Sequence, residues 1–278
     1  MVRHSDRNCE TVTVSDDPLA PLVRRAVAGD RAAMDQLCRA LEQPLFRLAL
    51  RILGEPADAR DATQEILLQI VTHLSQFRAE SRVSTWAYAI ATRCLLRARK
   101  KRSQRLNMER LETRIRLGLA STEDVAARAF NGPLAVETCV GCTNAMLQAI
   151  SLHERMAVVL CELLGADDHL AAQLCGVSEP VHRKRLSRGR AKLRPILERL
   201  CGLAREAAPC SGERQLQAKR RAGLAVLPNP ELRIAAADAE FRKLRELGAV
   251  FAFDAHVVPA REIWGELRRR LPAVFSVE

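Results

Sequence analysis

Residues 22–102 carry apolar side chains at intervals of three or four, the spacing with which an α-helix buries one face. The pattern predicts a helix over about 31–41, with Asp30 as its N-cap, and another that opens at Pro44 and closes at Gly54. A third helix carries a core stripe whose members step by four: Ala62, Ile66, Ile70 and Leu74.

The opposite face of this third helix is acidic and rich in amides, on a chain whose net charge is +11. It consists of Asp61, Gln64, Glu65, Leu68 and Gln69. One interpretation is a solvated helix surface. The other is a docking face for a basic partner, with Leu68 as an apolar anchor among the polar groups.

A polar segment without proline or glycine separates Leu74 from the next helical pattern, which Ser84 is predicted to cap. Aromatic residues make up only 4% of the chain, yet Phe77, Trp86 and Tyr88 gather around this segment. Flat rings beside cations suit unpaired nucleic-acid bases. Core packing is the alternative for Trp86 and Tyr88.

The helix after this segment ends in a run of cations from Arg93 to Arg105 that no acidic residue interrupts. Such a run is usually a solvated helix end. Its density, next to the aromatic residues, favours contact with phosphate groups.

Residues 139–200 show a second helical pattern that contains a helix-turn-helix signature. A short helix over about 168–175 stops at Gly176, and Ser178 begins a new helix with acidic and proline residues in its first turn. This helix is strongly basic, so it fits a DNA major groove with its N-terminal residues against base edges. A solvated basic helix is the alternative.

Two positions in this basic helix are unusual. His182 falls where an apolar side chain would pack, and we interpret it as a buried histidine with a hydrogen-bond partner. Gly189 lies inside the helix, where glycine costs about 1 kcal/mol relative to alanine.

The segments outside these two helical patterns complete the predicted domain organisation of the chain. Residues 1–21 are predicted to be a disordered tail, and residues 103–138 a linker interrupted by glycine and proline. Residues 201–278 form a C-terminal extension. The predicted class is therefore all-α, with two helical domains (22–102 and 139–200), a linker and a small helical extension.

Within the extension, the first part reads as an irregular basic segment. Two helices are predicted beyond it, over about 231–247 and 259–271, with Trp264 facing inward.

The overall composition narrows the function classes. A surplus of 44 basic over 33 acidic residues suits a polyanion such as nucleic acid. The first twenty residues carry no apolar signal core, and the apolar runs are too short to cross a bilayer. We expect a cytoplasmic protein without a membrane partner. P-loop glycines, an HExxH motif and a nucleophile elbow are missing, so we do not expect an enzyme.

Nine cysteines in a chain without a secretion signal are expected to be reduced. Buried free thiols are the preferred interpretation, and no metal or other cofactor is then expected. A redox switch and a zinc site are the alternatives. The zinc site would use the CVGC pair, Cys139 and Cys142, together with Cys201 and Cys210.

These motifs together resemble a known family. DARDATQE, QFRAES and STWAYAIA, in this order, are similar to region 2 of bacterial RNA polymerase sigma factors of the sigma-70 family, extracytoplasmic-function (ECF) group. The segment from LHERMAVV to RAKLRPIL resembles region 4 of the same group. The resemblance covers about residues 22–102 and 140–200. The trailing part, from Cys201, resembles the extended C-terminus of one branch of that group, which has a Cys-containing C-terminal extension.

The resemblance implies a sigma factor that binds RNA polymerase core and directs promoter recognition and DNA melting. A stand-alone helix-turn-helix regulator that does not need the core is the alternative function. The implied partners are polymerase core, promoter DNA and an anti-sigma factor. Val83, Ser84 and Ala89 depart from the side chains common in the family at these positions.

The resemblance also assigns residues to three surfaces. The core-binding surface is Asp61, Gln64, Glu65, Leu68 and Gln69. The surface for the single-stranded −10 element is Phe77, Arg78, Glu80, Ser81, Arg82, Trp86, Tyr88, Arg93, Arg97 and Lys100. The surface for the −35 duplex is Ser178, Val181, Arg183, Lys184, Arg185 and Arg188.

Overall fold

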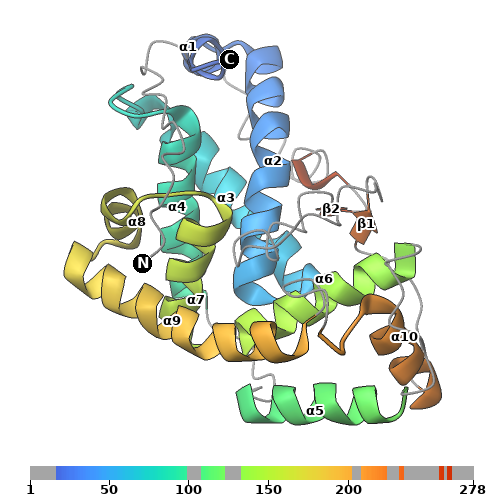
Figure 1. Cartoon of the computed structure of the whole chain (residues 1–278). Coiled ribbons are helices and arrows are strands. Elements are labelled where there is room, and N and C mark those ends of the chain that lie inside the picture. Colours follow the sequence, from blue (N-terminus) through green and yellow to red (C-terminus); the bar gives the residue numbers. More distant parts are fainter. Residues whose placement is uncertain are drawn as a thin grey trace.

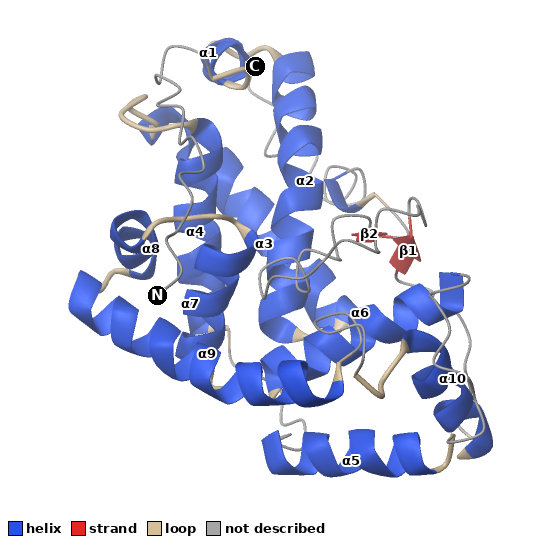
Figure 2. Ribbon diagram, viewed as in Figure 1, coloured by secondary structure: helices blue, strands red, loops and turns tan. Residues whose placement is uncertain are grey.

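A computed structural model of the chain describes seven segments, and all structural statements concern these: 17–98, 108–122, 133–201, 208–223, 232–234, 257–259 and 262–264. Figures 1 and 2 show that helices dominate the described chain, which confirms the predicted all-α class. No helix in these segments combines the length and apolar character needed to cross a membrane.

The first unit is a bundle of four helices joined by short turns. It contains α1 (Ala20–Val27), α2 (Arg31–Leu53), α3 (Pro56–His73), the 3-10 turn η2 (Leu74–Gln76) and α4 (Val83–Arg97). α2 packs against α1, α3 and α4, and therefore forms the centre of the bundle.

α2 is one continuous helix, so the prediction of a new helix opening at Pro44 is wrong. Proline inside a helix removes one backbone hydrogen bond. Here the apolar residues on both sides of it, Leu41, Leu45 and Phe46, are at most 4% exposed. Their burial on one face outweighs the local preference for a break. Gly54 ends the helix with a left-handed φ of 82°, as predicted.

The start of α4 also differs from the prediction. Arg82, not Ser84, is its N-cap residue, and it makes no side-chain capping bond. The cap comes instead from Asp17, whose Oδ2 accepts a hydrogen bond from the Val83 amide at 2.5 Å. Asp17 is only 6% exposed and also accepts from the Leu19 amide. The chain from residue 17 onwards therefore belongs to the folded unit, not to a tail that extends to residue 21.

The second unit contains α6 (Pro133–Gln148), α7 (Leu152–Val158), the π-helical turn η3 (Val159–Leu163), α8 (Asp168–Cys175) and α9 (Glu179–Leu200). A capping box between Ser151 and Glu154 begins α7. α8 ends at Gly176, which has a left-handed φ of 64°, and α9 starts three residues later. This is the predicted helix-turn-helix.

The two units share one hydrophobic core, and buried arginines join them. Arg155 of α7 is 3% exposed and donates to backbone carbonyls of Ile52, Leu147, Gln148 and Ile150. Gln148 also donates to α2 carbonyls, and a Cβ at Gly54 would meet it at 2.5 Å. The C-terminus of α2 is therefore capped by side chains of the second unit.

The predicted linker and the extension pack on each other, which the sequence did not indicate. The linker holds α5 (Met108–Ala120), and the stretch predicted as irregular holds α10 (Gly212–Arg221). Arg214 donates to the carbonyls of Leu119 and Thr122 at the end of α5. Apolar residues of α5 are buried, so this helix is part of the folded chain and not a simple connector.

The end of the extension returns to α2. A two-stranded antiparallel sheet, β1 (Leu232–Ile234) with β2 (Val257–Pro259), stands where the two predicted helices of the extension were to begin. Beyond β2, the backbone amides of Ile263 and Trp264 donate to the two carboxylate oxygens of Glu42 at 2.9 and 2.8 Å. The Trp264 side chain is 1% exposed, so its predicted inward orientation is confirmed.

Candidate nucleic-acid interface

The acidic face of α3 points to solvent along its length. Asp61 and Glu65 are exposed, whereas Gln64, Leu68 and Gln69 are half-buried. Gln69 Nε2 donates to Glu65 Oε1 at 3.4 Å, so the amide and the carboxylate are neighbours on one surface. Of the predicted core stripe, Ile66, Ile70 and Leu74 are buried, whereas Ala62 is half-buried. The structure therefore brings all five residues of the predicted docking face together.

The segment between η2 and α4 is a tight loop with an aromatic pair at its base. The Phe77 and Trp86 rings lie 5.5 Å apart at an interplanar angle of 59°. Ala79 has a positive φ of 56°, which costs a non-glycine residue about 1 kcal/mol or more. Arg78 and Glu80 are exposed at the loop tip. A sharply bent loop thus presents polar groups next to two half-buried rings.

The α4 residues divide between packing and surface. Burial raises the pKa of the Tyr88 hydroxyl, an effect that Arg47 of α2 partly offsets. Tyr88 and Trp86 are both half-buried and both pack against the hydrophobic core, so each ring has a packing role beside any contact with DNA. Trp86 stays half-buried, and Arg93 and Arg97 are exposed. Lys100, also predicted for this surface, lies outside the described residues.

A cavity of about 540 Å³ lies between α3 and α4. It joins the acidic face to the aromatic and basic residues, because both sets line it: Glu65, Gln69, Trp86, Arg93 and Arg97. Residues that the sequence assigns to two different partners therefore share one groove.

The basic face of α9 is exposed at its N-terminal half. Ser178, Val181, Arg183, Lys184 and Arg188 are exposed, and Arg185 is half-buried. Val181 is an apolar side chain with 43% of its surface exposed. Ser178 is the N-cap residue, but its hydroxyl makes no capping bond. The residues predicted to contact duplex DNA therefore lie together on one open surface.

Other cations of α9 have a structural role that the sequence alone did not reveal. Arg190 donates to Glu162 at 2.5 Å, and Lys192 Nζ lies 2.7 Å from Glu154 Oε1. Both acids belong to the α7–η3 segment, so these cations hold α9 on its neighbour.

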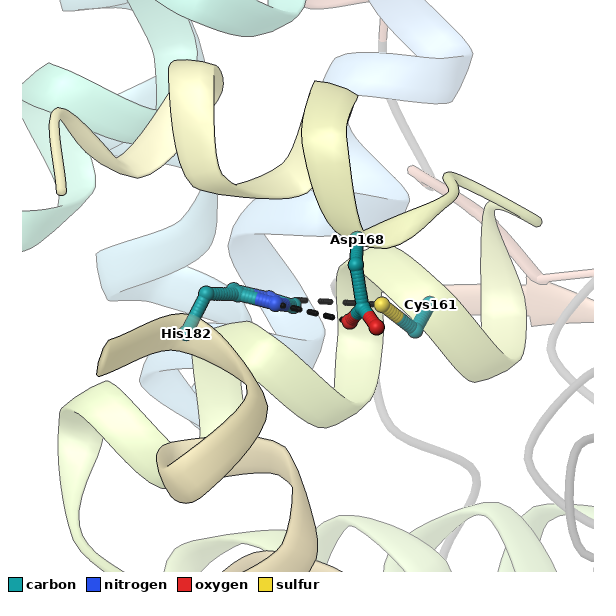
Figure 3. Close-up of side chains that lie close together, drawn as sticks. All are labelled: Cys161, Asp168 and His182. Carbon is teal, nitrogen blue, oxygen red and sulfur yellow. Dashed lines mark hydrogen bonds and ion pairs between the residues drawn. The ribbon is translucent and has the colours of Figure 1, made fainter. Parts of the chain in front are cut away.

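His182 has no exposed surface, and its Nδ1 lies 3.2 Å from Asp168 Oδ1. The interpretation as a buried histidine with a partner is confirmed. Its Nε2 lies 4.0 Å from the sulfur of Cys161, as Figure 3 shows.

No disulfide joins two of the described cysteines, in line with the preferred interpretation of reduced thiols. Burial raises the pKa of Cys161 and of Cys210 to about 12, so neither thiol ionises near neutral pH. Cys142, Cys201 and Cys210 of the zinc alternative are neighbours. Of Cys139, only the backbone is described. Among the described residues, one group with metal-binding spacing occurs, and it does not include these three.

Comparison with known proteins identifies the family. Residues 37–105 match the family model Sigma-70 region 2. The chain is 31% identical over 179 residues to ECF RNA polymerase sigma factor SigM of Mycobacterium tuberculosis (strain ATCC 25618 / H37Rv), covering 64% of this chain and 84% of SigM. The chain belongs to the ECF RNA polymerase sigma factors. It is thus a subunit that binds polymerase core and directs promoter recognition and DNA melting.

Two further relatives extend the comparison. This sigma factor is 29% identical over 189 residues to ECF RNA polymerase sigma factor SigE of Mycolicibacterium smegmatis (strain ATCC 700084 / mc(2)155), covering 67% of this chain and 70% of SigE. Among solved structures, CnrH in complex with the cytosolic domain of CnrY aligns with a TM-score of 0.44 at 20% identity, covering 64% of this chain and 96% of CnrH. Sigma factors are in general non-enzymatic regulators of transcription initiation.

Proposed function

We propose that the acidic face of α3 docks on polymerase core while the adjacent loop and α4 hold the unpaired bases of the −10 element. The observation that carries this assignment is the groove between α3 and α4. Glu65 and Gln69 of the acidic face line it together with Trp86, Arg93 and Arg97 of the −10 surface. If one wall of the groove binds polymerase core, the other wall can face the DNA strand that is bound in the core.

The proposed melting step depends on stacking and on phosphate contact. Stacking on an aromatic ring stabilises an unpaired base by about 1–3 kcal/mol. Phe77 and Trp86 supply the rings, and the exposed Arg93 and Arg97 supply charge for the strand that carries the base. A base that thermal opening exposes only briefly is then held outside the duplex.

The helix-turn-helix is proposed to read the −35 element as an intact duplex. The exposed residues at the start of α9 are long cations around the apolar Val181, a combination that suits base edges and thymine methyl groups. Arg190 and Lys192 are engaged by glutamates, so the contacts are assigned to the first half of the helix.

The domain division follows from these roles. We assign core and −10 binding to residues 22–102, −35 binding to 139–200, and packing of α5 against α10 to the linker and extension. We also propose that the protein has no enzymatic activity and that it acts in the cytoplasm, where polymerase and chromosome meet. An anti-sigma partner stays a prediction of the family resemblance.

Core binding is tested by reversing charge on the acidic face. The double variant Asp61→Lys/Glu65→Lys is expected to lose co-purification with polymerase core and promoter-dependent RNA synthesis. A matched control, Glu109→Lys/Glu198→Lys, changes the net charge equally at exposed positions elsewhere and is expected to bind core normally. Unchanged core binding by the first variant would contradict the assigned face.

The same assay separates the alternative function. A stand-alone regulator binds duplex tightly without core, and charge reversal on α3 leaves that binding unchanged. The sigma factor proposed here binds promoter DNA tightly only in complex with core. The Trp86→Ala variant is expected to bind single-stranded −10 DNA more weakly and to bind core normally.

A further inference from the structure

Three side chains with metal-binding chemistry converge where the elements of the helix-turn-helix unit meet. Cys161 belongs to η3, Asp168 is the first residue of α8, and His182 lies on the first turns of α9. Figure 3 shows the three side chains pointing toward one another. One ligand atom from each lies within 4.8 Å of the others.

We propose that Cys161, Asp168 and His182 bind a zinc ion. Thiolate, imidazole and carboxylate are the ligand types that zinc takes in proteins. Zinc–ligand bonds of about 2.0–2.3 Å place tetrahedral ligand atoms about 3.3–3.7 Å apart. His182 can offer only one ring nitrogen to the ion. With one ligand atom from each side chain, the three atoms lie within 4.8 Å of one another, so they must close by up to about 1 Å to reach this spacing.

The local environment also suits an ion. His182 is fully buried, whereas Asp168 has a side chain 36% exposed, so the cluster reaches solvent on the carboxylate side. An ion can therefore enter without unfolding the unit. Three protein ligands leave a fourth position for water.

The backbone around Cys161 has an unusual helical conformation. α7 does not continue as an α-helix but widens into the π-helical turn η3, in which the Leu164 amide bonds to the Val159 carbonyl. Single-turn π-bulges inside α-helices are frequent at functional sites. Here the π-helical turn contains Cys161.

Zinc binding releases one proton from the site. The Cys161 thiol gives its proton to the buffer as the sulfur–zinc bond forms, and the hydrogen bond between His182 and Asp168 gives way to shared coordination. The ion then ties η3, α8 and α9 together. If the proposed reading of duplex DNA by α9 is correct, zinc would set the angle at which this helix is presented.

The test uses the full chain after chelator treatment. Added zinc is measured by metal analysis after gel filtration, and added cobalt(II) by its thiolate-to-metal absorption. One bound ion per chain and a thiolate band are expected. Cys161→Ser is expected to lose the band and weaken zinc binding at least tenfold, and Asp168→Asn, which keeps the size of the side chain, to weaken it as well.

Matched variants distinguish this site from the other cysteines. Cys94→Ser alters a half-buried thiol in α4, away from the cluster, and is expected to bind zinc normally. Zinc lost in Cys142→Ser but retained in Cys161→Ser would place the ion at the other cysteine group and overturn the proposal. Absence of binding at micromolar zinc would overturn it as well. These outcomes do not depend on polymerase, so they are independent of the proposed function.

Discussion

At the scale of single residues, Gly189 shows how packing can reverse a local preference. From the sequence, glycine within a helix is a cost. In the structure, a Cβ at this position would lie 2.7 Å from Val158 Cγ2 and 3.3 Å from the Glu154 carbonyl oxygen. Glycine is therefore what lets α9 cross close to α7.

Gly189→Ala is accordingly expected to destabilise the chain by about 1–3 kcal/mol, because the strain of overpacking exceeds the gain in helix propensity of about 1 kcal/mol. Urea unfolding followed by circular dichroism measures the change. Ser187→Ala, on the exposed side of the same helix, supplies the propensity gain without the contact and should be neutral or slightly stabilising. A Gly189→Ala chain more stable than the original would show that α9 can move away from α7 without cost.

At the scale of elements, Glu154 takes part in the cap that begins α7 and also joins α7 to α9. Its carboxylate accepts from the Ser151 amide in the capping box and from Lys192 of α9. Burial alone would raise its pKa, but the hydrogen bonds from Lys192 and Ser151 outweigh burial, and the pKa is lowered from the usual 4.5. The bonds therefore favour the ionised form in the folded chain.

A pH dependence follows from this lowered pKa. The unfolded carboxyl keeps its ordinary pKa, so the stabilisation is complete above about pH 4.5 and is lost as the pH falls through the lower folded value. Glu154→Gln is expected to flatten this acid-side loss and to lower stability near neutral pH. Unfolding free energies between about pH 3 and 6 measure it. An equally steep acid loss in the variant would assign it to other carboxylates.

At the scale of the whole molecule, the junction of the two units depends on Arg155. Its guanidinium donates to four backbone carbonyls drawn from α2, from α6 and from Ile150 in the turn between α6 and α7. Burial lowers its pKa to about 10, which still leaves it charged at neutral pH. The side chain thus satisfies the carbonyl ends of two helices where the units meet.

Arg155→Met keeps the length of the side chain but leaves these buried carbonyls without donors. We expect a loss of about 3 kcal/mol or more in unfolding free energy, since each unsatisfied buried group costs about 1–3 kcal/mol. Arg194→Met, which removes an exposed arginine of α9, should change stability by less than about 0.5 kcal/mol. Equal stability of the two variants would show that water replaces the lost donors at the junction.

Much of the site could be predicted because it depends on neighbours in the chain. Asp61 and Glu65 lie on one face of α3 because residues four apart share a face, and Gly176 ends α8 because it can adopt a positive φ. The same local logic failed at Pro44, where burial on both sides kept one helix intact.

Local pattern and spacing thus determined α3, the loop with its aromatic residues and the helix-turn-helix, since each depends on residues within a few turns of one another. Only the tertiary structure decided which charged side chains form ion pairs and which residues distant in the sequence come into contact. Glu42 receives the backbone of Trp264 across more than two hundred residues. Cys161, Asp168 and His182 lie close together because three helical elements pack at one point. No periodic pattern in the sequence predicts this contact.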